Sequence, residues 1–358
     1  MTTGLLIGYF EPLHLGHLQD INVAAGQVDT LHIVVLERDD GSSAFAVSIE
    51  DKARAVQVAC QHFGFVKVHT AKTLGIDVRS CCYDEVDTPL TFDVLRQLIH
   101  HLKLDDAVVF YQHDTQAPLD ETAYSDQSAI DLASLHYKIK TLPQTAFDSK
   151  TIYDNPLVNF HSIAPSARIN YTKTICIVGG ESSGKTTLVH KLANHYGATV
   201  ALEMGRLYVH SDLGGTEVGL QLSDYALIAA RHANAIHQAT TMATAPVTFV
   251  DTDFATTQAF CEEYEGHTDD VVAAFAMTNR MDLTIMLDNN VQWVADGMRQ
   301  LGSDQDRTRF ENRLLLMFDR YDITPQMITH DDYHERYLQA LTIVDGFLSQ
   351  LLSHKVNS

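Results

Sequence analysis

The stretch TICIVGGESSGKTT, residues 174–187, decides the fold of the second half of the chain. Within it, Gly179, Gly184, Lys185 and Thr186 match the pattern G-x-x-x-x-G-K-[ST]. The apolar run that precedes the first glycine is typical of a buried strand, and the residues after the lysine follow a helical period. A glycine-rich loop between strand and helix turns its backbone amides toward phosphates at the positive end of the helix. The stretch therefore predicts a nucleoside triphosphate site.

Within this loop the two side chains after the last glycine have separate expected tasks. Lys185 is expected to contact the β- and γ-phosphates, and Thr186 is expected to help hold Mg²⁺. The remaining contacts to the nucleotide are expected from the loop itself. The expected ATP-binding residues are Gly179, Gly180, Glu181, Ser182, Ser183, Gly184, Lys185, Thr186 and Thr187.

Two carboxylates close the apolar run VTFVDTD, residues 247–253. Asp251 and Asp253 alternate there, so they share one face of the strand or straddle its carboxyl end. Beside a phosphate loop, one of them can orient Mg²⁺ or accept the proton of a substrate hydroxyl. Solvated acids at the end of a strand are the alternative interpretation.

A GTPase is an alternative class of phosphate-loop protein. DLGG (residues 212–215) and NRMD (residues 279–282) imitate its two further motifs in the right order. However, Asp212 does not follow a buried apolar run, and Arg280 stands where guanine recognition requires lysine. We therefore favour another class of phosphate-loop protein.

The first half carries a second phosphate-binding pattern, GYFEPLHLGH, residues 8–17. His14, Gly16 and His17 form H-x-G-H directly after the first apolar run, with Pro12 at the turn and a helical pattern following. Two imidazoles at a helix N-terminus can donate hydrogen bonds to a triphosphate and stabilise a pyrophosphate leaving group. A pair of turn histidines without a ligand is the alternative.

Apolar runs and helical patterns alternate along both halves, which predicts an α/β fold with parallel sheets. Around residues 156–172 the pattern lapses, and we expect the domain boundary there. The predicted strands are 5–8, 31–36, 65–68, 107–111 and 135–142, then 174–178, 200–202, 247–250, 283–287 and 326–329. The predicted helices are 15–25, 50–62 and 92–102, then 186–195, 222–243 and 306–321. The polar segment from Gln112 is expected to be a loop that leads into a helix.

The composition excludes several classes of function. The 358 residues carry 25 Lys and Arg against 46 Asp and Glu, a net charge of −21 that is spread evenly over both halves. This balance disfavours binding to nucleic acid or to anionic membranes. Because there is neither a signal peptide nor an apolar stretch of membrane-spanning length, and the five cysteines form no disulfide or zinc pattern, we expect a cytoplasmic protein without membrane insertion.

The chain resembles the NadR-type bifunctional proteins, which join a nicotinamide mononucleotide (NMN) adenylyltransferase domain to a ribosylnicotinamide kinase domain. The resemblance spans nearly the whole chain and is densest in the second half. The strings that carry it there are GGESSGKTTLVHKLA, LEMGR, LGGTEVGLQLSDY, FVDTDFATTQAFCEEYEG and DNNVQWVADGMRQLG. It implies that the second half phosphorylates the 5′-hydroxyl of nicotinamide riboside with MgATP.

The resemblance also implies roles for residues outside the phosphate loop. Asp251 or Asp253 is similar to the residue that activates the hydroxyl, and Asp251, which ends the apolar run directly, is favoured. Asp251 is also expected to hold Mg²⁺ together with Thr186. Glu203 and Arg206 resemble groups that contact the ribose or the phosphates.

Further implied residues lie in the last third of the chain. Trp293 and Asn289 are expected to stack on and orient the nicotinamide, with core packing as an equal alternative for the tryptophan. Arg299 and Arg307 resemble lid arginines that clamp the γ-phosphate. A solvated helix face is the alternative for Arg307.

The first half resembles the adenylyltransferase less uniformly. Its H-x-G-H is intact, and the implied ATP contacts are Gly8, Tyr9, Phe10, His14, Gly16 and His17. The family usually has Arg or Lys where this chain has Tyr9. The family's closing motif, I-S-x-T-x-I-R, aligns through Pro156 with Asp148, Lys150 and Tyr153, and a slip of one residue aligns Ser149 and Thr151 with the hydroxyl positions instead.

The resemblance implies a Rossmann-like nucleotidyltransferase domain over residues 1–158, a linker over 159–172 and a phosphate-loop kinase domain over 173–358. It implies ATP, nicotinamide riboside and NMN as substrates, Mg²⁺ as cofactor, and NAD and pyrophosphate as final products. The alternatives are a monofunctional kinase whose first domain is a scaffold and a kinase regulated by a nucleotide-sensing first domain. The chain starts at its first strand, so no helix-turn-helix and no operator binding are expected, and a homo-oligomer remains open.

Overall fold

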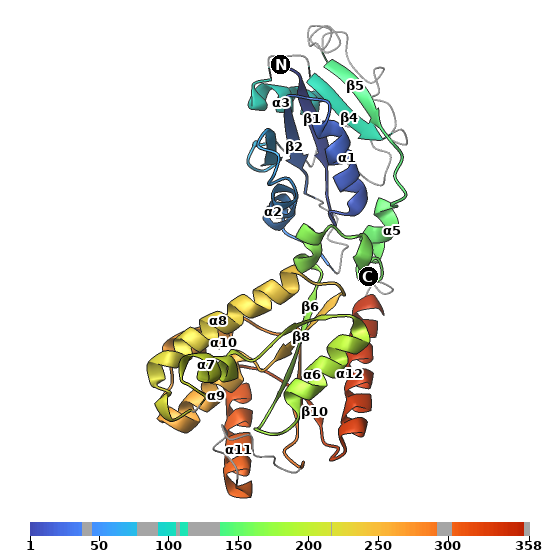
Figure 1. Ribbon diagram of the computed structural model, residues 1–358. Helices are drawn as coiled ribbons and strands as arrows, with labels where there is room; N and C mark the ends of the chain where they lie inside the picture. Colours follow the sequence, from blue (N-terminus) through green and yellow to red (C-terminus); the bar gives the residue numbers. More distant parts are fainter. Residues whose placement is uncertain are drawn as a thin grey trace. The chain divides into compact units, whose positions relative to one another are not determined.

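A computed structural model describes residues 1–37, 45–76, 92–104, 108–113, 137–215, 217–291 and 303–353 of the chain. The chain divides into two compact units, of which the N-terminal unit ends at Tyr171 and the C-terminal unit begins at Thr172. Each unit is built around one parallel sheet with helices on its faces (Figure 1). The predicted α/β class with two parallel sheets is confirmed.

The N-terminal unit holds a five-stranded sheet in the order β3-β2-β1-β4-β5, with all pairings parallel. Strand order reverses beside β1, which is where open α/β sheets bind ligands. Its elements are β1 (Thr3–Gly8), α1 (Leu15–Ala25), β2 (Thr30–Val35), α2 (Ile49–Ala59), β3 (Val66–Thr70), α3 (Phe92–Leu102), β4 (Val108–His113), β5 (Tyr137–Leu142), α5 (Ser149–Asp154), η2 (Phe160–Ser162) and η3 (Pro165–Asn170).

The end of the N-terminal unit returns to its first phosphate-binding pattern. The backbone amide of Ala164 donates to the carbonyl of Leu13 at 2.9 Å, and Ile163 forms an isolated bridge with His14. The residues expected to form a linker, 159–172, therefore include the two 3₁₀ helices η2 and η3, and part of this segment lies against the H-x-G-H loop.

The C-terminal unit holds a second five-stranded sheet, in the order β10-β9-β6-β8-β7, again with parallel pairings. The first strand, β6, lies in the middle between β8 and β9. Its elements are β6 (Lys173–Gly179), α6 (Lys185–Tyr196), β7 (Thr199–Ala201), α7 (Met204–Asp212), η4 (Glu217–Gly219), α8 (Leu222–Thr241), β8 (Val247–Asp251), α9 (Phe254–Glu265), α10 (Asp270–Thr278), β9 (Leu283–Leu287), α11 (Asp304–Arg320), β10 (Gln326–Ile328) and α12 (Tyr333–Ser353).

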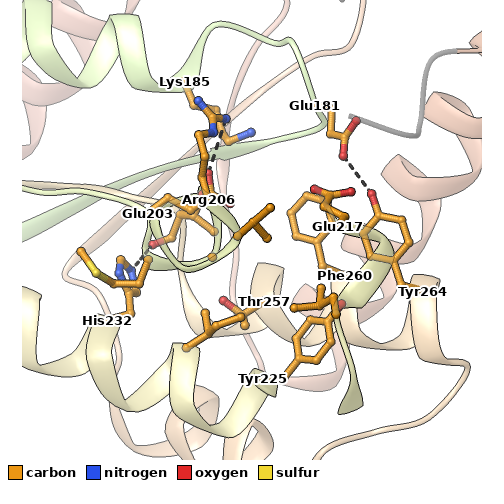
Figure 2. Close-up of a pocket in the computed structure, with 16 residues that line it drawn as sticks. Glu181, Lys185, Glu203, Arg206, Glu217, Tyr225, His232, Thr257, Phe260 and Tyr264 are labelled. Carbon is orange, nitrogen blue, oxygen red and sulfur yellow. Dashed lines mark hydrogen bonds and ion pairs between the residues drawn. The ribbon is translucent and has the colours of Figure 1, made fainter. Parts of the chain in front are cut away.

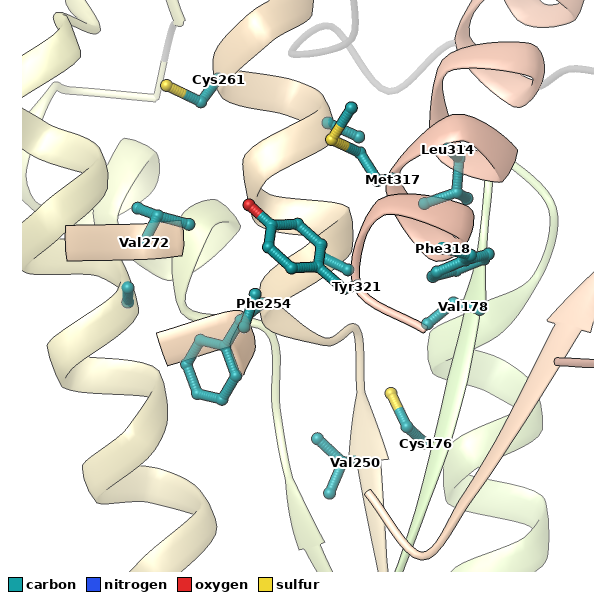
Figure 3. Close-up of a cluster of buried hydrophobic side chains, with 14 of the residues drawn as sticks. Cys176, Val178, Val250, Phe254, Cys261, Val272, Leu314, Met317, Phe318 and Tyr321 are labelled. Atoms are coloured by element: carbon teal, nitrogen blue, oxygen red, sulfur yellow. The ribbon is translucent and has the colours of Figure 1, made fainter. Parts of the chain in front are cut away.

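Alternate residues of β6 enter different cores, as the two-residue repeat of a strand requires. Cys176 and Val178 belong to a cluster with α8, α9, α10 and α11, part of which is drawn in Figure 3. Ile175 and Ile177 belong to a second cluster with α6 and α12. Because both faces are covered, the strand is apolar from Ile175 to Val178, and this continuous apolar run made it recognisable in the sequence.

Of the predicted elements, helices 15–25 and 92–102 and strand 283–287 have the predicted bounds, and the others differ at their ends by a few residues. The sequence reasoning did not predict α5, α7, α9, α10 or α12. Most of the polar segment from Gln112, including its expected helix, lies outside the described residues. Among the described helices, none combines the length and apolar character needed to cross a membrane.

Two imidazoles lie face to face on β2 and β3. Nδ1 of His32 lies 3.1 Å from Nε2 of His69, and the rings are parallel within 7°. Burial, and then the neighbouring His69 and Lys67, lower the pKa of His32 to about 4. Burial and Lys67 also lower the pKa of His69. The folded unit therefore holds both rings neutral at pH values where an unfolded chain would protonate them.

This pair predicts an acid-sensitive N-terminal unit. An unfolded histidine binds a proton near pH 6.5, so the free energy of unfolding should fall as the pH drops from about 7 toward 4, by up to about 1.4 kcal/mol per pH unit for each histidine. His32→Val should reduce this slope in urea unfolding measured across that range, whereas His62→Gln, at an exposed histidine of the same unit, should keep it. Equal slopes in His32→Val and the wild type would contradict the assignment.

Candidate active sites

The phosphate loop of the C-terminal unit begins at a glycine that no other residue can replace without a shift of the backbone. Gly179 has φ of +145°, and a Cβ built on it would lie 2.7 Å from the carbonyl oxygen of Leu287 on the neighbouring strand. The loop then leads into α6, whose first backbone amides have no partner within the helix. The geometry offers a group of N–H donors at the carboxyl end of the central strand, suited to an anion.

Lys185 lies buried over this loop. Its ammonium group donates to the carbonyls of Gly179 and Gly180 at 3.0 and 2.9 Å. The next residue, Thr186, donates its hydroxyl to Oδ2 of Asp251 at 2.6 Å. The structure thus brings the first turn of α6 and the end of β8 together.

The two aspartates after β8 differ in their surroundings. Oδ1 of Asp251 is buried and accepts no hydrogen bond from the described residues. Asp253 is the N-cap of α9, because its Oδ1 accepts from the backbone amide and the hydroxyl of Thr256 at 2.8 and 2.6 Å. Burial raises the pKa of Asp253. Asp253 therefore stabilises a helix, while Asp251 faces the phosphate loop.

A cavity opens beside Lys185 at the carboxyl end of the sheet (Figure 2). It contains Glu203 and Arg206, which follow β7, and its far end is aromatic. Asp253 and Asn289 do not line it. Its lining residues are Glu181, Lys185, Glu203, Met204, Gly205, Arg206, Val209, Glu217, Leu220, Tyr225, Ile228, His232, Thr252, Thr257, Phe260 and Tyr264.

Glu203 is the N-cap residue of α7, directly after the edge strand β7. Its carboxylate lies 3.7 Å from the guanidinium of Arg206. Burial, and then the negative charge of Asp251, raise the pKa of Glu203, although Lys185 and Arg206 act in the opposite direction. A carboxyl group with a raised pKa at the inner end of a cavity is suited to exchange a proton with a ligand.

Thr252 links the end of β8 to the cavity wall. Its φ of +74° is rare for a β-branched residue. The ring Nε2 of the buried His232 donates to its carbonyl oxygen at 2.9 Å, and burial lowers the pKa of His232. The neutral imidazole therefore helps to hold the strained turn that follows Asp251.

Asn289 and Arg307 contact each other instead of a ligand cavity. The Arg307 guanidinium is buried and donates to Oδ1 and the carbonyl of Asn289 and to the carbonyl of Val291. The alternative of a solvated helix face for Arg307 is wrong, because its side chain is buried. Asn289 packs on Gly180, where a Cβ would lie 3.1 Å from its Oδ1. Trp293 and Arg299 lie outside the described residues.

A second buried arginine, Arg336, was missed by the sequence reasoning. It is 2% exposed and donates to the carbonyls of Ser183 in the phosphate loop and of Asp288 after β9, each at 2.8 Å. It also donates to His330 and Asn290. Because charged residues are rarely buried, the sequence contains no local signal that Arg336 supports this loop.

The residues that imitate GTPase motifs have other tasks. Asp212 lies at the end of a helix and pairs with Arg231 at 3.0 Å. Asp282 accepts from the backbone amide of Thr174 at 2.8 Å, and Arg280 donates to the carbonyls of Tyr321 and Asp322. These groups hold the ends of strands and helices together, which agrees with the preference for another class.

In the N-terminal unit, the two histidines of H-x-G-H close the first turn of α1. His14 caps the helix, since its Nδ1 accepts from the amide of His17, while Nδ1 of His17 accepts from the amide of His14, both at 3.3 Å. The two rings are stacked with centroids 3.6 Å apart. Gly16 is required between them, because a Cβ there would lie 2.9 Å from the His14 ring.

The remaining residues of this loop pack around the histidines. Phe10, with φ of +50°, is buried, and its ring lies against Gly8 and edge-on to His17. Tyr9 packs partly buried against the cluster around Leu5, on the side of α3. Tyr9 thus contributes to the core in place of the basic residue that the family usually has.

Ser149 faces the histidines from the start of α5. Its hydroxyl lies 2.8 Å from Nε2 of His14. Asp148 instead caps α5 through the amide of Lys150 and the hydroxyl of Thr151, and that hydroxyl lowers the pKa of Asp148. Of the two alignments of this segment, the geometry favours the one that puts Ser149 at a hydroxyl position.

The acidic residue of the loop is neutralised within the unit. Oε2 of Glu11 accepts from the ammonium group of Lys52 on α2 at 2.8 Å, and the two side chains are only 6% and 3% exposed. A buried carboxylate without this partner would be costly and would repel a triphosphate. The sequence reasoning missed Lys52, which lies 41 residues from Glu11.

Comparison with known proteins assigns relatives to both units. The family model described as AAA domain matches residues 174–336. The trifunctional NAD biosynthesis/regulator protein NadR of Escherichia coli K12 is 34% identical over 357 residues, which cover 98% of this chain and 84% of the relative. Crystal structures of NadR protein in complex with NR, and with NAD and AMP-PNP, have TM-scores of 0.71 and 0.68; each is 22% identical, and each alignment covers 97% of this chain and 96% of that chain.

The close approach at Gly179 yields a test of the phosphate loop. Gly179→Ala should lower the free energy of unfolding of the C-terminal unit by about 1–3 kcal/mol and should abolish the rise in the melting temperature of that unit that MgATP causes. Gly346→Ala is the matched control, because nothing lies within 4 Å of a Cβ there and its φ is not positive. This control should be neutral or slightly stabilising. A Gly179→Ala variant whose C-terminal unit is stabilised by MgATP as strongly as that of the wild type would contradict the geometry.

Proposed function

Because the chain belongs to the NadR family of NAD biosynthesis proteins, we propose that it makes NAD from nicotinamide riboside in two steps, one in each unit. The C-terminal unit phosphorylates nicotinamide riboside to NMN. The N-terminal unit transfers the adenylyl group of a second ATP to NMN. The observation that carries this proposal is the cavity beside Lys185, which brings the charged side chains of Glu203 and Arg206 next to the phosphate loop.

In the kinase step the riboside lies in the cavity with its 5′-hydroxyl toward Lys185. The hydroxyl oxygen attacks the γ-phosphorus of ATP, the bond from that phosphorus to the β–γ bridging oxygen breaks, and ADP leaves. Lys185 moves from the loop carbonyls to the β- and γ-phosphates, and the amides at the start of α6 hold the transferred charge. Arg206, which lines the same cavity beside Glu203, is available to contact the phosphates or the ribose.

The residues around Thr186 fit a magnesium ion that arrives with ATP. Mg²⁺ prefers oxygen ligands and is usually held by few protein groups in addition to phosphates and water. The Thr186 hydroxyl and the buried, unsatisfied Oδ1 of Asp251 are such groups, side by side at the end of β8. When bound, the ion neutralises charge on the β- and γ-phosphates. We therefore assign Asp251 to the metal.

The proton of the attacking hydroxyl goes to Glu203 in this proposal. Glu203 lines the cavity, whereas Asp253 caps α9 and Asp251 is engaged by Thr186. The raised pKa of the Glu203 carboxyl makes it a better proton acceptor than an ordinary glutamate. The sequence analysis assigned the activation of the hydroxyl to Asp251 or Asp253. We propose instead that Glu203 is the base and that Asp251 holds the metal.

In the adenylyl transfer an oxygen of the NMN phosphate attacks the α-phosphorus of ATP. The bond to the α–β bridging oxygen breaks, so that NAD forms and pyrophosphate leaves. His14 and His17, at the N-terminus of α1, and the Ser149 hydroxyl are positioned to donate hydrogen bonds to the triphosphate. No covalent intermediate with the protein is required.

We further propose that the adenylyltransferase comprises the N-terminal unit through Tyr171 and the kinase the unit from Thr172, with MgATP as the shared cosubstrate. A cytoplasmic location is consistent with Cys60, Cys176 and Cys261, which are buried free thiols.

Glu203→Gln tests the base. This variant should lower kcat of riboside phosphorylation about 100-fold or more, since a general base contributes 10²–10⁴. In the wild type, kcat should rise with pH through the raised pKa of Glu203, and this rise should be absent in the variant. Glu335→Gln, at an exposed residue of α12, is the control and should keep both rate and profile. An unchanged pH profile in Glu203→Gln would exclude it as the base.

A pair of variants tests the division of labour. Lys185→Ala should lose NMN formation from nicotinamide riboside and keep NAD formation from NMN, because its ammonium belongs to the kinase loop. His17→Ala should lose NAD formation from NMN and keep NMN formation from nicotinamide riboside. Both activities are measured by chromatography of products with each substrate and MgATP supplied separately. If either folded variant lost both activities, the two sites would not be independent. If the wild type itself formed no NAD from NMN, the N-terminal unit would be a scaffold or a nucleotide sensor.

A further inference from the structure

The first turn of α12 packs against the phosphate loop of the C-terminal unit. A Cβ built on Gly184 would lie 2.8 Å from the ring of Tyr333, and Arg336 follows one turn later. Arg336 is only 2% exposed, so its guanidinium is too deeply buried to contact a nucleotide. Neither residue lines the cavity beside Lys185. The helix therefore reaches the loop without taking part in that cavity.

Each nitrogen of the Arg336 guanidinium donates a hydrogen bond. Nη1 donates to the carbonyl of Ser183 in the loop, and Nη2 donates to the carbonyl of Asp288 after β9, both at 2.8 Å. Nε donates to the carbonyl of His330 after β10, and Nη2 donates also to the side-chain oxygen of Asn290. All four acceptors are neutral oxygens, so the contact depends on the planar fork of donors that arginine has and lysine lacks.

The bond to Ser183 fixes the orientation of one peptide group in the loop. The carbonyl of Ser183 and the N–H of Gly184 belong to the same trans peptide, so they point in opposite directions. Because Arg336 holds the carbonyl, the N–H is directed away from Arg336, at the start of α6. If this peptide turned over, a phosphate bound there would lose a donor and would meet the negative end of a carbonyl.

The backbone on either side of Ser183 does not impose this orientation. Ser182 has φ of +58° and Gly184 has φ of +89°, so both neighbours lie in the left-handed region. A glycine adopts other conformations about as readily as this one. The peptide group therefore needs a partner outside the loop, and Arg336 is such a partner.

We propose that Arg336 is a positioning residue of the kinase, which holds the peptide between Ser183 and Gly184 with its amide directed toward the phosphates of ATP. The affinity of the C-terminal unit for MgATP then depends on a side chain that never contacts the nucleotide. This inference rests on the proposed function, in which the loop binds ATP, and it adds the residue that keeps the loop ready to bind.

One test uses the wild type alone. The chain contains a single Ser-Gly step, at residues 183–184, so cell-free synthesis with carbonyl-¹³C serine and ¹⁵N glycine gives one doubly selected NMR signal for the amide of Gly184. Saturating MgADP should move its proton downfield, because a phosphate oxygen accepts from it. An unmoved signal in protein that calorimetry shows to be saturated would overturn the inference without any variant.

A second test removes the fork of donors. Arg336→Lys keeps the charge, so the Kd for MgADP measured by calorimetry should rise about tenfold or more, as for the loss of a hydrogen bond to a charged group, while KM for the riboside stays unchanged. Arg231→Lys is the matched control and should keep both values, because Arg231 is 43% exposed and pairs with Asp212. In Arg336→Ala, guanidinium chloride below denaturing concentration should restore MgADP binding, and sodium chloride should not.

The outcomes separate this inference from the proposed function. A folded Arg336→Lys that binds MgADP as tightly as the wild type, or a rise in riboside KM equal to the rise in Kd, would overturn the role of Arg336 while the kinase function stands. A wild type that binds MgADP but phosphorylates no riboside would remove the kinase function, and the Kd of the variants would still decide the role of Arg336.

Discussion

Both candidate sites depend on one constraint: an acidic chain must hold a triphosphate. With a net charge of −21, the protein as a whole repels ATP, so the attraction has to be local. In each unit it comes from the carboxyl end of a central parallel strand that leads directly into a helix. β1 leads to α1 and β6 leads to α6. The first backbone amides of each helix provide hydrogen-bond donors that do not require a charged side chain.

The side chains around each strand end differ between the two units, and these differences suit two different reactions. In the C-terminal unit a lysine, a threonine and an aspartate surround the strand end, which suits transfer of a terminal phosphate. In the N-terminal unit two stacked histidines and Ser149 surround it, and the loop's own acid is neutralised by Lys52. The buried Arg336 stabilises the phosphate loop of the C-terminal unit, because it donates hydrogen bonds to carbonyl groups of the loop and of the turn after β9.

Much of this could be predicted because the decisive signals are local. Buried strands such as 283–287 are short runs in which nearly every residue is apolar, and both phosphate patterns are short. The helix α9 was missed although Asp253 is its N-cap, because that aspartate was interpreted as a magnesium ligand, a proton acceptor or a solvated acid at the end of the strand. Glu217 and Tyr264 lie in strings that resemble the family, but their convergence with Glu181 on one cavity requires the tertiary fold. The same holds for Lys52 and Arg336, whose partners are distant in sequence.

The central claim is that one chain carries two consecutive ATP-dependent steps. The most direct measurement is a balance of products after the wild-type protein is mixed with nicotinamide riboside and excess MgATP, with NMN, NAD, ADP and pyrophosphate quantified over time. We predict that NMN rises and then falls, and that NAD, ADP and pyrophosphate finish in equal amounts. NMN and ADP accumulating in equal amounts, with neither NAD nor pyrophosphate, would contradict the claim.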